Sequence, residues 1–261
     1  MPVTWESEEE PKPGITRRQW VRLGLKTAAF AAGAAATGGG ALILRELLPP
    51  PVLSSATVMD TLVYTAFPFE QWWNDKANTP VRVGDFALWA GATAVWRGLF
   101  DDSGVLVPGT GYPVLIIRVP RVDTYYSLPN PLPWTLTEGF GLFYDDPARD
   151  IRIVAAFDRC THLCCYPGWH VVTNPPLPRD YLVQPPTYEV YHEDPVYCIC
   201  HDTQYDPLLL IADTNPHNGV LFPGMELVRA PGTFALPLVP LRAVDDILEG
   251  GVVDPRWYVY C

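Results

Sequence analysis

Proline is the residue that most restricts how this chain can fold. It occupies 29 of the 261 positions, and each proline fixes φ and removes a backbone donor, which interrupts long helices. The sequence also holds 13 tyrosines and 9 tryptophans, residues that favour strands. We therefore expect a mostly-β chain of short strands joined by rigid loops, in an antiparallel sandwich or barrel rather than alternating βαβ units.

Several apolar runs with turn-forming residues close by are expected to be strands. They are residues 114–119, 151–157, 208–211 and 257–260. One short helix is expected near residues 71–77. The sequence has no internal repeat, no P-loop and no dinucleotide fingerprint. It also lacks the Cys-x-x-Cys-His motif of covalently attached haem.

The charge is negative and unevenly distributed. Lysine and arginine total 18 against 29 aspartates and glutamates, a net charge of -11, which argues against a nucleic-acid partner because phosphate binding needs a basic face. Bases and acids nearly balance in residues 1–48, so the excess of acid lies in the remainder. Hydrophobic residues make up 48 %, enough for a sizeable core.

The N-terminal segment is expected to be an export signal and an anchor. Arg17 and Arg18 precede an uncharged stretch from Thr27 to Leu44, which as a helix spans roughly 27 Å. This resembles a twin-arginine signal, which exports folded proteins. We expect a cytoplasmic tail at residues 1–26, a single transmembrane anchor at 27–48 and, beyond the membrane, an extracytoplasmic (periplasmic) body.

A proline run opens the segment between anchor and body. Residues 49–58 are interpreted as a hinge, and residues 59–261 as the exported domain. The small residues at 54–56 also suit a cleavage site, so a retained anchor and a removed signal both fit the sequence.

The cysteines point to a metal site. Five of the six lie between Cys160 and Cys200, a clustering more typical of metal binding than of a scattered disulfide framework. They fall in two boxes, CTHLCC at residues 160–165 and CICHDTQY at residues 198–205. Each box offers a cysteine and a histidine, a mixed set of soft sulfur and imidazole ligands.

The two boxes resemble those of the Rieske iron–sulfur protein family, which read Cys-x-His-x-x-Cys and Cys-x-Cys-His. The resemblance implies one 2Fe–2S cluster per chain, with Cys160 and Cys198 on one iron and His162 and His201 on the other. It further implies a disulfide between Cys165 and Cys200. The implied fold is a Rieske-type antiparallel β sandwich, with a small cluster-binding subdomain at about residues 156–235.

Three further residues take roles from the same resemblance. Thr203 and Tyr205 stand where the family has a serine and a tyrosine, whose hydroxyls bond a cluster sulfide and the Cys160 sulfur and raise the reduction potential. Pro231, within residues 229–237, matches the family's proline loop. Residues 215–225 are the other proline- and glycine-rich candidate for that loop.

The chain departs from the family in several places. Asp202 and Cys164 each replace a usual glycine, and the charge of Asp202 would lower the potential. Cys164 and Cys261 have no assigned role, and we hypothesise that they form a second disulfide in an oxidising compartment. The long insertion at residues 166–197 is open to three interpretations: a cover for the cluster, a partner contact or a passive surface loop.

The resemblance implies one-electron transfer in a quinol–cytochrome c oxidoreductase, a dimeric membrane complex with cytochrome b. His162 or His201 would take a proton from quinol, and the electron would pass to a c-type cytochrome or an equivalent acceptor. One alternative is the small Rieske subunit of a molybdenum oxidase such as arsenite oxidase. A second is an exported binding domain stabilised by zinc, which the same ligand types suit.

Overall fold

The computed structural model describes most of the C-terminal four fifths of the chain. The described residues are 57–101, 103, 105–107, 109–168, 182–183, 196–254, 256–257 and 259–261. Within them, no helix is long and apolar enough to cross a membrane. The expected tail, the 27–48 anchor, the cleavage site, most of the hinge and most of the 166–197 insertion lie outside these residues.

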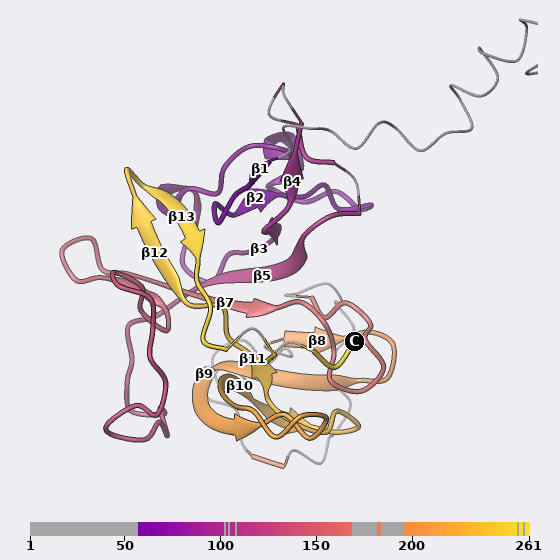
Figure 1. Cartoon of the computed structure of the whole chain (residues 1–261), viewed down its shortest axis with the longest axis vertical. Coiled ribbons are helices and arrows are strands. Elements are labelled where there is room, and N and C mark those ends of the chain that lie inside the picture. The colour runs from indigo at the N-terminus through magenta and orange to yellow at the C-terminus, as the bar shows by residue number, and fades with distance from the viewer. Residues whose placement is uncertain are drawn as a thin grey trace, which may run out of the picture. The chain divides into compact units, whose positions relative to one another are not determined.

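The largest sheet has five strands, all antiparallel (Figure 1). Its strands in spatial order are β2 (Val63–Tyr64), β3 (Gly91–Trp96), β5 (Tyr112–Val119), β7 (Ile151–Phe157) and β6 (Tyr144–Asp146). β5 lies between β3 and β7, with Val114 opposite Phe157 in the register of the second pair. The central strands of this sheet thus connect the N-terminal part of the described chain to the first cysteine box, which follows β7.

A second antiparallel sheet has four strands and carries the second cysteine box. Its order is β11 (Leu236–Pro237), β10 (Leu221–Arg229), β9 (Thr203–Thr214) and β8 (Val196–Cys198). The box spans the turn from β8 into β9. Two short pairs complete the described strands: β1 (Thr57–Val58) with β4 (Leu99–Phe100), and β12 (Leu241–Val244) with β13 (Ile247–Gly250).

The five-stranded sheet is buried on both faces, and each face has its own core. Alternate residues of a strand point to opposite faces. Val114 and Ile116 of β5 accordingly pack in one core with Trp257, while Leu115 and Ile117 pack in the other against residues of the four-stranded sheet. This double burial explains why the sequence of β5 is a continuous apolar run rather than an alternating one. The second core also contains Cys160 and Cys198.

The expected mostly-β, antiparallel class is confirmed, and so are three of the four strand predictions. Residues 151–157 form β7, and residues 114–119 and 208–211 lie within β5 and β9. The predicted strand at 257–260 is wrong. Its described residues lie in turns, in which the Trp257 N–H donates to Asp254 and the Val259 N–H donates to Arg256, both at 3.1 Å.

The helix expected near residues 71–77 is reduced to one 3-10 turn, η1 (Asn74–Lys76). A second such turn, η2 (Val83–Asp85), follows. The side chain of Asn74 accepts from the Phe67 N–H at 2.9 Å and donates to the Phe69 carbonyl at 2.8 Å. These bonds fold the preceding loop against the turn and compete with helix continuation. At the N-terminal end of the described chain, Thr57 and Val58 of the expected hinge form β1.

Candidate metal centre

The structure divides the six cysteines, all of them described, into two groups. Cys165 and Cys200 form one disulfide, with Cα atoms 6.5 Å apart, and Cys164 and Cys261 form another, with Cα atoms 5.6 Å apart. The disulfide that the resemblance implies and the second disulfide that we hypothesised are thus both present. The two cysteines left free are Cys160 and Cys198, and both are buried. They are the two for which the sequence predicted a ligand role.

The two boxes adopt the same tight turn. The Cys164 N–H donates to the Cys160 carbonyl at 3.0 Å, and the Asp202 N–H donates to the Cys198 carbonyl at 2.9 Å. The residue that closes each turn is left-handed, with φ of 61° at Cys164 and 66° at Asp202. Glycine adopts this conformation without the steric cost that a Cβ imposes. This is a physical reason for glycine at the two positions where the sequence departs from the Rieske pattern.

The two histidines of the boxes lie next to each other. The ring centroids of His162 and His201 are 4.7 Å apart and the rings are nearly perpendicular, at 88°. His201 is exposed and His162 is half-buried. The Nδ1 atom of His162 is buried without a hydrogen-bond partner. A buried ring nitrogen normally has a partner, so this one is suited to a ligand that the chain does not supply, such as a metal.

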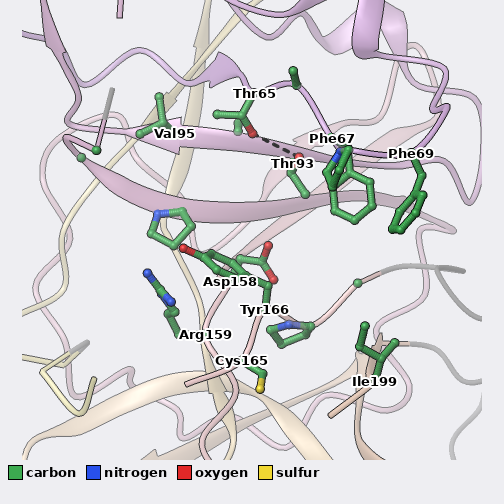
Figure 2. A pocket seen from close by; sticks show the side chains of 18 of the residues that line it. Thr65, Phe67, Phe69, Thr93, Val95, Asp158, Arg159, Cys165, Tyr166 and Ile199 are labelled. Carbon is green, nitrogen blue, oxygen red and sulfur yellow. Dashed lines mark hydrogen bonds between the residues drawn. The ribbon is translucent and has the colours of Figure 1, made fainter. Parts of the chain in front are cut away.

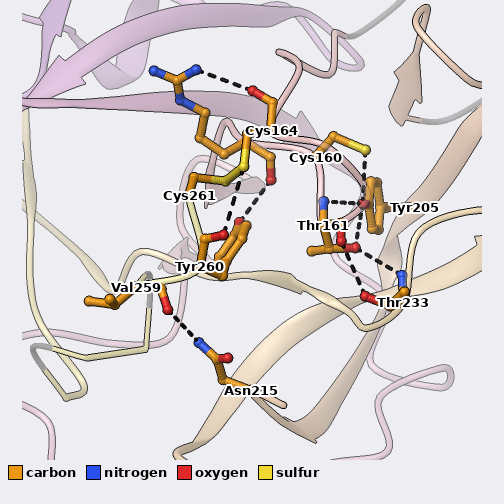
Figure 3. Close-up of a disulfide and its surroundings, with 10 residues drawn as sticks. Cys160, Thr161, Cys164, Tyr205, Asn215, Thr233, Val259, Tyr260 and Cys261 are labelled. Carbon is orange, nitrogen blue, oxygen red and sulfur yellow. Dashed lines mark hydrogen bonds between the residues drawn. A yellow bond between two sulfur atoms is a disulfide. The ribbon is translucent and has the colours of Figure 1, made fainter. Parts of the chain in front are cut away.

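Tyr205 connects the second box to the first. It is fully buried, and its hydroxyl lies 3.5 Å from the Cys160 sulfur. The same hydroxyl accepts from the Thr161 N–H at 2.9 Å and lies 2.9 Å from the Thr161 hydroxyl oxygen. Figure 3 shows this group beside Thr233. The predicted Tyr205–Cys160 contact is therefore present, and the sequence did not single out Thr161, which anchors it.

The third loop that meets the boxes is formed by residues 229–237. The Gly232 N–H donates to the Thr203 hydroxyl at 2.9 Å, and the Thr233 hydroxyl donates to the Thr161 carbonyl at 3.1 Å. A Cβ at Gly232 would lie 2.6 Å from Thr203 and 3.0 Å from Thr161, so only glycine permits this approach. Pro231 precedes it on the exposed side.

The alternative loop at residues 215–225 has a different role. The Asn215 amide donates to the carbonyls of Trp257 and Val259, at 3.2 and 3.4 Å. This loop therefore holds the C-terminal segment, whereas residues 229–237 meet both boxes.

The free cysteines interact with each other. A hydrogen bond from Cys198 lowers the pKa of Cys160 against the effect of burial, and further bonds from the His162 N–H, Tyr205 and Thr203 act in the same direction. The same contact, followed by burial, raises the pKa of Cys198. Cys160 is therefore the thiol prepared to be a thiolate, the form in which cysteine binds metals.

Three sulfur atoms, those of Cys165, Cys198 and Cys200, lie within 4.8 Å of one another. They do not make a three-thiolate site, because two of them are joined in a disulfide. Neither histidine belongs to that group. In a two-iron cluster the four ligands are divided between two metals, so they need not converge on one point.

The second disulfide fixes the C-terminal residues beneath the first box (Figure 3). The Tyr260 hydroxyl donates to the Arg159 carbonyl at 2.8 Å. Its ring packs edge-on against Phe157 and Phe234, with centroids 5.7 and 5.1 Å away. Sequence reasoning missed this support. The one available signal was the position of Tyr260 next to Cys261.

No model of a known protein family matches the sequence, and no curated protein matches it.

Proposed function

We propose that this chain is a Rieske-type one-electron carrier, the electron-transfer subunit of a quinol–cytochrome c oxidoreductase. The observation that carries the proposal is the division of the cysteines. Four are joined in disulfides, and the two that remain are buried in adjoining turns whose histidines lie 4.7 Å apart. A disulfide scaffold needs no buried free thiols, whereas a cluster with two thiolate and two imidazole ligands does.

The residues fit a 2Fe–2S cluster held by Cys160 and Cys198 on one iron and by His162 and His201 on the other. The buried, unpartnered Nδ1 of His162 is the clearest sign of this fit. When bound, the cluster supplies a one-electron couple whose potential is raised because two imidazoles replace two thiolates. Tyr205 and Thr203 hold hydroxyls toward Cys160 and stabilise additional negative charge there.

The exposed surface of the two boxes suits a substrate that gives up a proton with its electron. His201 is exposed, and an imidazole accepts a proton near neutral pH. Leu163, which follows His162, and Ile199, two residues before His201, are 62 % and 55 % exposed. Large exposed apolar side chains around a polar group are typical of a docking surface. A quinol bound on cytochrome b meets both requirements.

The finer fold and location belong to the same proposal. The four-stranded sheet with residues 156–235 is the cluster-binding subdomain, and the five-stranded sheet is its base. Two disulfides fit an oxidising, extracytoplasmic compartment. Residues 27–48 anchor the domain in the membrane, residues 49–58 link the two, and the head passes electrons to a c-type cytochrome.

The test is purification of the full-length protein from membranes, with iron, sulfide and zinc measured together. We expect equal iron and acid-labile sulfide, the Rieske paramagnetic signal on reduction, and copurifying cytochrome b. Zinc without iron would contradict the proposal in favour of a zinc-stabilised domain. A copurifying molybdopterin subunit would reassign the chain to a molybdenum oxidase.

Variants test the ligands one at a time. We expect Cys160→Ser and His201→Ala to lose the paramagnetic signal. His217→Ala is the matched control, because His217 is an exposed histidine outside the boxes. A signal retained in either ligand variant would overturn the assignment of that ligand.

A further inference from the structure

A cavity of about 700 Å³ lies beside the cysteine boxes, between the edge of the five-stranded sheet and the first box. One wall is formed by residues 65–69 and 93–95, and the other by residues 158–159 and 165–168 with Ile199 and Cys200. Figure 2 shows Thr93 and Phe67 on one side and Asp158 and Tyr166 on the other. This volume is within the range of small-molecule sites, about 300–1,000 Å³.

The lining is mainly apolar and partly aromatic. Phe67, Phe69 and Tyr166 supply rings, and Val95 and Ile199 supply aliphatic surface. The Thr65 hydroxyl donates to that of Thr93 at 3.1 Å, so one side chain satisfies the other. An apolar cavity of this size is a poor site for water, which needs several polar partners for each molecule.

One polar group in the cavity wall lacks a partner. Asp158 is only 2 % exposed, and its Oδ1 atom has no hydrogen-bond partner. The backbone N–H of Asp158 is used by the Pro113 carbonyl at 2.9 Å. A buried hydrogen-bond acceptor without a donor destabilises the folded state. A hydrogen-bond donor on a bound ligand would satisfy this oxygen.

The nearest cation does not satisfy this carboxyl. The Arg159 guanidinium donates to the Cys164 carbonyl at 3.2 Å and lies over the Tyr166 ring, 4.1 Å from its centroid. It still contributes positive charge to the cavity wall. A cationic ligand would be repelled by it, whereas a neutral molecule with an O–H donor would not.

We propose that this cavity is a binding site for a small, neutral, aromatic molecule that carries a hydroxyl group, with Asp158 accepting the hydroxyl hydrogen bond. The rings of Phe67, Phe69 and Tyr166 contact the aromatic body. The cavity shares Ile199 with the exposed surface of the two boxes, but neither His162 nor His201 lines it. The inference does not depend on the identity of the metal.

The test is photolabelling of the full-length protein in lipid nanodiscs, because detergent would compete for an apolar cavity. Two matched probes are used: a trifluoromethyl-phenyldiazirine with a benzylic hydroxyl, and the same compound without the hydroxyl. Labelled residues are mapped by mass spectrometry. We expect the hydroxyl probe to label residues 65–69 and 166–168 saturably, and unlabelled 2-naphthol to compete with it.

Two variants address opposite walls of the cavity. Asp158→Leu removes the acceptor, and we expect labelling by the hydroxyl probe to weaken about tenfold while the apolar probe is little affected. Thr93→Phe fills the cavity and leaves Asp158 intact, and we expect it to abolish labelling by both probes. Unchanged far-ultraviolet circular dichroism shows that each variant has folded.

Three outcomes overturn the proposal. They are labelling that does not saturate, labelling that maps elsewhere on the chain, and a Thr93→Phe variant that labels like the parent protein. Equal labelling by both probes in the parent protein would contradict the proposed hydrogen bond from the ligand hydroxyl to Asp158. If Asp158→Leu does not fold, the Thr93→Phe result alone decides whether the cavity binds the probe.

Discussion

Among the interactions around the free thiols, the contact of the Tyr205 hydroxyl is the one that a single substitution tests most directly. It lies 3.5 Å from the Cys160 sulfur in a fully buried setting. A donor to a ligand sulfur stabilises the reduced, more negative state, so its loss lowers the reduction potential.

We therefore expect Tyr205→Phe to keep the cluster but lower its potential by roughly 50 mV, the equivalent of about 1 kcal/mol for one hydrogen bond and one electron. The measurement is a redox titration followed by paramagnetic resonance. Tyr197→Phe is the control, because it likewise removes one tyrosine hydroxyl near the second box, one that donates to the Asp202 carboxylate. An equal shift in both variants would show that the effect is not specific to the sulfur contact.

Asp202 permits a second test at the scale of one residue. Its carboxylate lies 3.6 Å from Arg229 and accepts from the Tyr197 hydroxyl. A negative charge near the cluster disfavours an additional electron. We expect Asp202→Asn to raise the potential by a few tens of millivolts at low salt, where screening is weakest. A lower potential in this variant would contradict that sign. Asparagine is the right substitution because it tolerates the left-handed conformation observed here, φ 66°.

At the scale of elements, the C-terminal turn supports the first box. The Cys164–Cys261 disulfide closes a loop with a sequence separation of 97 residues. A cross-link of this length constrains the unfolded chain strongly, and removal of a native disulfide typically costs about 2–5 kcal/mol.

We expect the double variant Cys164→Ser/Cys261→Ser to unfold and lose its cluster at a lower temperature, while its ligands stay unchanged. Both cysteines are replaced so that neither thiol is left to mispair. The measurement is thermal unfolding monitored by visible absorbance and far-ultraviolet circular dichroism together. An unchanged midpoint would indicate that Tyr260 and Asn215 hold the segment without the disulfide.

The sequence predicts best those elements whose secondary structure is determined mainly by one local property, such as burial. Residues 151–157 are apolar except for Arg152 and are buried along their whole length, so burial largely determines that they form a strand inside the sheet. The segment at 257–260 is also apolar and is rich in aromatic residues, but Cys261 is bound to Cys164 and Asn215 holds two of the segment's carbonyls. Those partners are distant in sequence, so no local pattern reveals them.

The residues of the candidate site also fall into those that local sequence predicts and those that depend on distant contacts. The resemblance of the two boxes to a known motif pointed to Cys160, His162, Cys198 and His201, because the ligands within each box are close together in the sequence. The sequence also indicated residues 229–237 as a third loop, but not the contacts that Gly232 and Thr233 make with Thr203 and Thr161. The cavity beside Asp158 lies between segments about 90 residues apart, a relation that only the fold discloses.

At the scale of the whole molecule, stability in acid depends on an ionic group at the edge of the five-stranded sheet. Arg152 of β7 is 4 % exposed and donates to Asp145 of β6 at 2.9 Å. Hydrogen bonds from Arg121 and then Arg152 lower the pKa of Asp145 from its ordinary 3.8 to about 2. The folded protein therefore releases this proton more readily than the unfolded chain does.

The sign of the pH dependence follows from that difference. The stabilisation from Asp145 is complete above about pH 4 and is lost as the pH falls toward 2. It amounts to roughly 1–2 kcal/mol for a carboxyl that is about a quarter exposed. We expect Asp145→Asn to reduce the free energy of unfolding at pH 7 and to flatten its dependence on pH between 4 and 2. Asp150→Asn is the control, because Asp150 is 85 % exposed and lies 3.8 Å from the same Arg121.

The adjacent cysteines of the first box have a consequence for oxidative folding. Cys164 and Cys165 are neighbours in the chain, yet one is joined to Cys261 and the other to Cys200. Exchanging those partners gives an isomer with the same atoms and the same number of bonds. In the native structure the backbone at Cys164 is left-handed, φ 61°, and the two neighbouring side chains reach different partners. Oxidative folding of this protein therefore has to form one of two covalent isomers that differ only in which neighbour each partner joins.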